Sequence, residues 1–165
     1  MAASLMDRLA AARRQRFVGR TMERELFQAA LRAPELPFFV LHLFGPGGVG
    51  KTTLLREFGY CATQLQDRPI YLDSRNIEAA PDLFLAALQQ AIGVKSAEEI
   101  IPWLAAQAGR TVLLFDTYEL LSPLDNWLRE HFLPQLPGNV LVVMAGRNPP
   151  ALVWRTDPGW ASMMR

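Results

Sequence analysis

This chain of 165 residues is constrained most by one glycine-rich octapeptide, Gly45-Pro46-Gly47-Gly48-Val49-Gly50-Lys51-Thr52. The octapeptide follows the apolar run 38–44, and a helical pattern begins at Lys51. Its glycines allow the backbone to curl so that successive N–H groups point toward one anion. The positive end of the following helix adds to this attraction, so the sequence predicts a phosphate-binding loop between a strand and a helix.

The side chains of this loop carry the chemistry of a nucleotide site. Lys51 can reach the β- and γ-phosphates, and the Thr52 hydroxyl can hold Mg²⁺. With Thr53, the whole segment from Gly45 onward is expected to contact the nucleotide. The alternative is a glycine-rich turn between strand and helix that carries a lysine by chance.

Four apolar runs predict strands, at 38–44, 69–73, 111–115 and 140–145. Helical patterns alternate with these strands, at about 21–32, 51–65, 81–92 and 96–108, and from Pro123 onward. The segment Ser96-Ala97-Glu98-Glu99 has the pattern of a capping box. The alternation predicts an α/β fold, a three-layer α/β/α P-loop NTPase sandwich with a mainly parallel sheet.

Polar residues follow two of the predicted strands at the edge where ligands of such sheets bind. Asp116 ends the run 111–115, the place of a Walker-B aspartate that holds Mg²⁺, although a helix N-cap is the simpler role. Glu119 is a carboxylate that could polarise the attacking water. Arg147 follows the last strand and could stabilise charge on the γ-phosphate, or else pair with a surface carboxylate.

The composition limits the other classes of function. The net charge of +1 gives no general attraction to nucleic acid or to anionic membranes, so we expect no direct nucleic-acid contact from this segment and no membrane contact. Cys61 is the only cysteine, and it lies on the apolar face of the predicted helix after the loop. Because one cysteine cannot form an intrachain disulfide, a reducing cytoplasmic location is expected.

The two ends of the chain differ from its centre. Residues 1–16 carry four arginines and predict a basic lead-in, either a solvated helix or an arm that meets a partner. Residues 146–165 predict an irregular stretch, in which Trp154 and Trp160 are expected to pack against a missing part of the protein. Since a doubly wound sheet calls for a fifth strand after this stretch, we expect the chain to be truncated.

Taken together, these motifs resemble a known family. The segment Phe17-Val18-Gly19-Arg20, followed by Glu23 and Leu26, is similar to the box that precedes the P-loop in AAA+-related signal-transduction (STAND) ATPases. The P-loop, the Walker-B run that ends at Asp116 and the strand before Arg147 follow in that family's order. The resemblance covers residues 17–165 as one nucleotide-binding domain that lacks its C-terminal lid and output domains.

The resemblance implies roles that spacing alone does not give. Val18 and Gly19 would lie beside the adenine, Arg20 near the nucleotide or a neighbouring protomer, and Arg147 would be the sensor-1 residue. Glu119 matches an acidic position of related ATPases. Thr117 departs from the pattern, because many such ATPases carry the catalytic acid there, and this departure puts hydrolysis in doubt.

The expected function is therefore an ATP/ADP- and Mg²⁺-binding switch module of a bacterial signalling or transcription regulator, with weak ATPase activity and with protein partners or self-association through the missing domains. Lys51, Asp116, Glu119 and Arg147 are the expected catalytic residues, and Thr52 and Asp116 the expected metal ligands. Two alternatives stay open: a P-loop kinase that phosphorylates a small molecule, and a non-hydrolysing interaction domain.

Overall fold

A four-stranded sheet lies at the centre of the computed structural model, which describes residues 3–9, 21–47 and 50–165. All neighbouring strands are parallel, in the order β1-β4-β3-β2. The strands are β1 (Val40–Phe44), β2 (Arg68–Asp73), β3 (Thr111–Asp116) and β4 (Val140–Gly146). The four predicted strands are thus confirmed, with small shifts at their ends.

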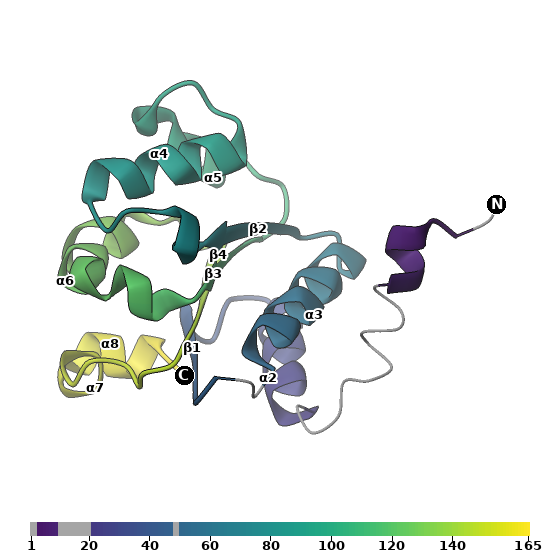
Figure 1. The fold of residues 1–165 in the computed structure, drawn as a ribbon, viewed down its shortest axis with the longest axis horizontal. Helices are drawn as coiled ribbons and strands as arrows, with labels where there is room; N and C mark the ends of the chain where they lie inside the picture. Colours follow the sequence, from purple (N-terminus) through teal and green to yellow (C-terminus); the bar gives the residue numbers. More distant parts are fainter. Residues whose placement is uncertain (1–2, 10–20, 48–49) are drawn as a thin grey trace.

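Helices cover both faces of this sheet (Figure 1). The labelled α-helices are α2 (Thr21–Arg32), α3 (Lys51–Gln64), α4 (Pro81–Ile92), α5 (Ile100–Ala105), α6 (Asp125–Trp127), α7 (Val153–Thr156) and α8 (Pro158–Met163), and residues 5–9 are also helical. In Figure 1, α2 and α3 lie on one side of the sheet and the other labelled helices lie on the opposite side. The predicted three-layer α/β/α sandwich is confirmed. None of the helices described is both long and apolar enough to cross a membrane.

Two apolar clusters hold the layers together, one on each face of the sheet. In β3, Val112 and Leu114 pack with α2 and α3, whereas Leu113 and Phe115 pack with α4, α5 and α7. All four side chains are fully buried. A parallel strand covered on both faces needs apolar side chains at successive positions, which is why the strands read as unbroken apolar runs.

The predicted capping box is wrong in detail. The Ser96 side chain forms no capping hydrogen bond at the start of η2 (Ala97–Glu99), a 3₁₀ turn that precedes α5. The Glu99 carboxylate instead accepts a hydrogen bond from the backbone N–H of Lys95 at 3.3 Å, one residue further back than expected. Helix α5 also ends at Ala105, before the predicted end.

The helical segment after β3 starts earlier than predicted. It begins at Tyr118 with the 3₁₀ helix η3 (Tyr118–Leu124), so Pro123 lies inside it and does not open it. The side chains of Tyr118 and Leu121 are buried and pack in the apolar cluster on the α4 side of the sheet. Two further helical turns, η4 (Leu128–Phe132) and η5 (Leu133–Gln135), complete the connection to β4.

The stretch after β4 is ordered into α7 and α8, so the prediction of an irregular segment is wrong. Asp157 caps α8 by accepting hydrogen bonds from two backbone N–H groups, at 2.9 and 3.1 Å. Beyond α8, Met164 pairs in parallel with Val40 on the outer edge of β1. The backbone N–H of His42 donates to the carbonyl of Arg165 at 2.8 Å, so strand-like pairing continues there.

Candidate functional site

A hollow of about 440 Å³ lies at the carboxyl ends of the strands and is open to solvent. Parallel α/β sheets bind their ligands at this edge. Residues from the loop after β1, from α3, and from the segments after β2, β3 and β4 line the hollow: Gly47, Gly50, Lys51, Thr52, Thr53, Arg75, Asp116, Thr117, Glu119, Ala145, Gly146 and Arg147. Four of these, Lys51, Asp116, Glu119 and Arg147, are the residues that the sequence predicts to be catalytic.

The described residues of the loop after β1 have features of a phosphate-binding loop. Gly50 adopts a left-handed conformation with φ of 83°, which a glycine reaches without strain, and helix α3 begins at the next residue. The Lys51 ammonium group bends back and donates to the carbonyls of Gly45 at 2.7 Å and Pro46 at 2.8 Å. Lysine charge and the N-terminus of a 14-residue helix therefore meet at one end of the hollow.

Two oxygen donors from different elements meet beside the loop. The Thr52 hydroxyl lies 3.3 Å from a carboxylate oxygen of Asp116, within hydrogen-bonding distance. Hydroxyl and carboxylate oxygens are ligands that Mg²⁺ accepts, and Mg²⁺ keeps several of its waters, so it needs few protein ligands. No group of three or more His, Cys, Asp and Glu side chains suited to a metal occurs among the residues that the structure describes. The Thr52–Asp116 pair thus fits a hydrated Mg²⁺ held together with phosphates.

Thr117, directly after Asp116, has an unusual backbone conformation. Its φ of 56° and ψ of 45° are left-handed, which costs a β-branched residue about 1–2 kcal/mol. Its N–H donates to the Asp116 carboxylate at 2.8 Å, so the tight turn also fixes that side chain. Strain of this kind is commonly retained where it orients functional groups.

Glu119 and Arg147 form a pair on the opposite wall of the hollow. The Glu119 carboxylate accepts a hydrogen bond from the Arg147 backbone N–H at 3.1 Å and lies 3.6 Å from its guanidinium. Gly146 makes this approach possible, because a Cβ at that position would lie 2.8 Å from the Glu119 carboxylate. The Arg147 guanidinium also reaches the P-loop, where a Cβ on Gly47 would lie 3.7 Å from it.

Arg75 lines the same hollow and was missed by the sequence analysis. It follows β2 in the short 3₁₀ turn η1 (Ser74–Asn76), and its guanidinium forms an ion pair with Asp73 at 2.7 Å. The hydrogen bonds from Arg75 lower the pKa of Asp73 and so keep this carboxylate charged. The sequence did contain a signal for Arg75. Polar residues follow the predicted strand 69–73, and a parallel strand ends at the edge of the sheet where ligands bind.

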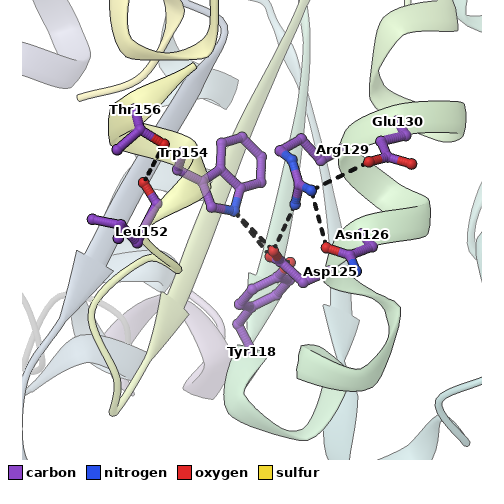
Figure 2. Close-up of polar contacts among 8 residues, drawn as sticks. All are labelled: Tyr118, Asp125, Asn126, Arg129, Glu130, Leu152, Trp154 and Thr156. Atoms are coloured by element: carbon purple, nitrogen blue, oxygen red, sulfur yellow. Dashed lines mark hydrogen bonds and ion pairs between the residues drawn. The ribbon is translucent and has the colours of Figure 1, made fainter.

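A polar network joins the segments that follow β3 and β4 (Figure 2). The Asp125 carboxylate accepts hydrogen bonds from the Tyr118 hydroxyl at 2.6 Å, from the Arg129 guanidinium at 3.2 Å and from the Trp154 indole at 3.0 Å. Burial and the nearby Asp125 raise the pKa of Tyr118, so its hydroxyl remains a donor.

The expectation that Trp154 and Trp160 pack against a missing part of the protein is therefore wrong for Trp154, whose side chain is fully buried within this chain. The Trp160 ring packs against it, with ring centroids 4.9 Å apart. The hydrogen bond from the Trp154 indole N–H to Asp125 holds the ring inside the domain.

Five predicted site residues lie outside the described part of the chain: Val18, Gly19, Arg20, Gly48 and Val49. Their expected contacts with the nucleotide stay predictions. The other predicted positions all lie at or next to the hollow described above: Gly45, Pro46, Gly47, Gly50, Lys51, Thr52, Thr53, Asp116, Glu119 and Arg147. Their chemical roles also stay predictions.

Comparison with known proteins gives a match in structure alone. No protein-family model and no curated protein matches the chain. The structure of Drosophila ORC bound to DNA matches with a TM-score of 0.65 and 19% identity, covering 85% of this chain and 40% of that one. The Aeropyrum pernix ORC1 protein in complex with DNA matches with a TM-score of 0.54 and 20% identity, covering 86% and 41%. The fold is that of the AAA+ P-loop ATPases.

A third match bears on ligands and partners. The replication initiator DnaA, bound to AMPPCP and single-stranded DNA, has a TM-score of 0.50 and 19% identity, covering 80% of this chain and 39% of that one. The chain thus spans about two fifths of the length of these AAA+ proteins. All three structures contain DNA, and this finding contradicts our expectation that such a segment makes no direct nucleic-acid contact. Net charge was a poor guide, because contacts with DNA depend on where charges lie and not on their sum.

Proposed function

We propose that the chain binds ATP with Mg²⁺ in the hollow and serves as a nucleotide-dependent switch module. One observation carries this proposal: the glycine loop, Lys51, the Thr52–Asp116 pair and Arg147 surround the same space. The AMPPCP that is bound to the similar DnaA structure supports an adenine nucleotide as the ligand. A glycine-rich turn with a chance lysine would not be expected to face an aspartate and an arginine from two other strands.

Each group has a role that follows from its position. The loop N–H groups and the start of α3 bind the phosphates, and Lys51 exchanges its carbonyl partners for phosphate oxygens. Thr52 and Asp116 would hold Mg²⁺, which when bound offsets the negative charge of the phosphates. The Arg147 guanidinium, close to the P-loop, stabilises charge on the terminal phosphate.

Hydrolysis should be slow for two reasons. Thr117 supplies a hydroxyl where a carboxylate would be needed to take a proton from water. Glu119, the nearest alternative base, is engaged by both the backbone and the side chain of Arg147. Water activation would require this pair to separate. Slow turnover suits a cytoplasmic regulator of signalling or transcription whose nucleotide state changes its contacts with other proteins.

Calorimetry of ATP binding with Mg²⁺ tests the site. Lys51→Ala should weaken binding by about 1.5–3 kcal/mol, the contribution of a hydrogen bond to a charged group. Lys95→Ala is the matched control, because Lys95 is the only other lysine and lies on the exposed surface far along the chain. Equal affinity in wild type and Lys51→Ala would refute the site. Analysis of the products, free phosphate or a phosphorylated metabolite, separates slow hydrolysis from the kinase alternative.

A second candidate function is favoured by the structural matches, which are complexes with DNA. We propose that the module works on nucleic acid, with ATP binding changing its affinity. Fluorescence anisotropy with labelled single- and double-stranded oligonucleotides, with and without ATP, tests this proposal. Binding that strengthens with ATP in wild type and not in Lys51→Ala supports it, and the absence of binding at low salt with either oligonucleotide contradicts it.

A further inference from the structure

Arg75 lies at the end of the hollow that contains the Thr52–Asp116 pair. The strand that precedes it, β2, runs beside β3, and Asp73 is the register partner of Asp116. Arg75, Thr52 and Asp116 also line a second hollow of about 360 Å³ on the β2 side of the site. Arg75 therefore stands where the two hollows meet, next to the Thr52–Asp116 pair and away from the start of the P-loop.

The turn that carries Arg75 is built to hold the guanidinium in one orientation. Ser74, between Asp73 and Arg75, is almost completely buried, and its carbonyl accepts a hydrogen bond from the Ile77 backbone N–H at 3.3 Å. The Asp73 carboxylate accepts from the Arg75 backbone N–H at 3.1 Å, from Nε at 3.0 Å and from Nη2 at 2.7 Å. The remaining nitrogen, Nη1, donates to none of the residues that the structure describes. Three of the five guanidinium N–H groups, two on Nη1 and one on Nη2, thus stay available on a side chain that Asp73 orients.

The charges around the hollow are consistent with a ligand that carries several phosphates. Lys51, Arg75 and Arg147 each bind a partner on their own side of the hollow, namely loop carbonyls, Asp73 and Glu119. ATP carries one more phosphate than ADP, and Mg²⁺ bridges its β- and γ-phosphates. A cation beside the proposed Mg²⁺ ligands therefore faces the end of the nucleotide where ATP and ADP differ.

We propose that Arg75 donates a hydrogen bond to the terminal phosphate of bound ATP, and that Asp73 is the positioning residue that orients its guanidinium. This inference rests on the proposed function, because it needs ATP in the hollow. Arg75 then makes the site prefer ATP over ADP from the β2 side, while Arg147 contacts the same phosphate from the β4 side. Arginine suits this position because one edge of its planar guanidinium can hold Asp73 while the other binds phosphate.

The test is the ratio of ATP to ADP affinity, measured by calorimetry with Mg²⁺ on the full chain. Arg75→Gln should weaken ATP binding about tenfold, the loss expected for one charge-assisted hydrogen bond at an exposed position, and should change ADP binding less than twofold. Asp73→Asn should lower the ratio by a smaller factor. Arg56→Gln is the matched control, because Arg56 lines only the second hollow, and its ratio should stay that of wild type.

The outcomes separate this inference from the proposed function. If Lys51→Ala leaves ATP binding unchanged, the nucleotide site itself is wrong. If Lys51→Ala weakens ATP binding as expected while Arg75→Gln keeps the wild-type ratio, only the role of Arg75 is overturned. Circular dichroism checks that each variant is folded, and Arg75→Lys gives a second measurement that keeps the charge. If Arg75→Lys lowers the ratio of ATP to ADP affinity less than Arg75→Gln does, the result supports a phosphate contact that depends partly on the planar guanidinium. If every Arg75 variant loses the binding of both ATP and ADP, the result contradicts a selective contact with the terminal phosphate.

Discussion

Acid should destabilise this domain through one buried histidine. His42 lies in the middle of β1 with a side chain only 8% exposed, and its Nδ1 has no hydrogen-bond partner among the described residues. The rings of Phe44 and Tyr118 lie edge-on to it, with centroids 6.0 and 5.8 Å away. Burial lowers the pKa of His42 from 6.5 to about 4, against an opposing effect of Asp125 and with a small contribution from Arg155.

The size of the effect follows from these two pKa values. Below pH 6.5 the imidazole of the unfolded chain takes up a proton, whereas the folded chain stays neutral until about pH 4. The unfolded state therefore binds more protons in this window, and the free energy of unfolding decreases as the pH falls. With about 1.4 kcal/mol for each pH unit, the loss approaches about 3 kcal/mol at pH 4. Above pH 6.5 the stabilisation is fully present.

Urea unfolding at pH 7.0, 5.5 and 4.5 measures this loss. Carboxylates also titrate in acid, so the quantity of interest is the difference between wild type and His42→Leu, in which their contributions largely cancel. Relative to pH 7.0, wild type should lose about 1 kcal/mol more of its free energy of unfolding than His42→Leu at pH 5.5. At pH 4.5 this excess loss should be about 2 kcal/mol or more. His131→Gln, a change of the only other histidine, at an exposed position, should follow wild type. Parallel pH profiles for wild type and His42→Leu would refute the reasoning.

Three further predictions concern groups around the site. Thr117→Asn should raise the free energy of unfolding by about 1 kcal/mol in urea, since asparagine tolerates the left-handed conformation; an unchanged or lower value would argue against strain at this turn. Gly146→Ala should cost about 1–3 kcal/mol, because its Cβ would meet the Glu119 carboxylate and backbone, whereas Gly138→Ala meets no atom within 4 Å and serves as the control; equal stability of the two variants would contradict the crowding. Trp154→Phe should cost about 2 kcal/mol or more by thermal unfolding, since Asp125 loses the indole donor. Trp127→Phe is the control, because it makes the same change in ring size at a stacked tryptophan that does not donate to Asp125, and an equal loss in the two variants would count against the network.

The strands could be predicted because a strand that is buried on both faces of the sheet has apolar residues at successive positions in the sequence. The run Val112–Phe115 is apolar at every position since its side chains enter two clusters, and Gly50 and Gly93 stand where the backbone has positive φ. Asp116 and Arg147 could be expected at one edge because the carboxyl ends of parallel strands meet there. Local rules of this kind do not depend on which distant residues come into contact.

Other features could not be predicted because they depend on such distant contacts. Trp154 is buried since it donates to Asp125, 29 residues earlier in the chain, and nothing near either residue indicates this bond. The positive φ of Thr117 runs against the preference of a β-branched residue, so its sequence argues for another conformation. Arg75 was not among the predicted site residues, and the placement of its turn beside Asp116 brings it to the hollow.

The Asp125 network also has a mechanical consequence. Asp125 holds Tyr118, the neighbour of Glu119, and Trp154, which lies on α7 beyond Arg147. If a bound phosphate draws Arg147 away from Glu119, the segment that carries Tyr118 and the segment that carries Trp154 cannot move independently, because the partly buried Asp125 carboxylate would lose a hydrogen-bond donor. The two segments should therefore move together. Helix α8, which contacts α7, and the pairing of Met164 with Val40 should move with them. A displacement that starts at the terminal phosphate of the nucleotide would in this way reach the outer edge of β1, where Met164 pairs with Val40.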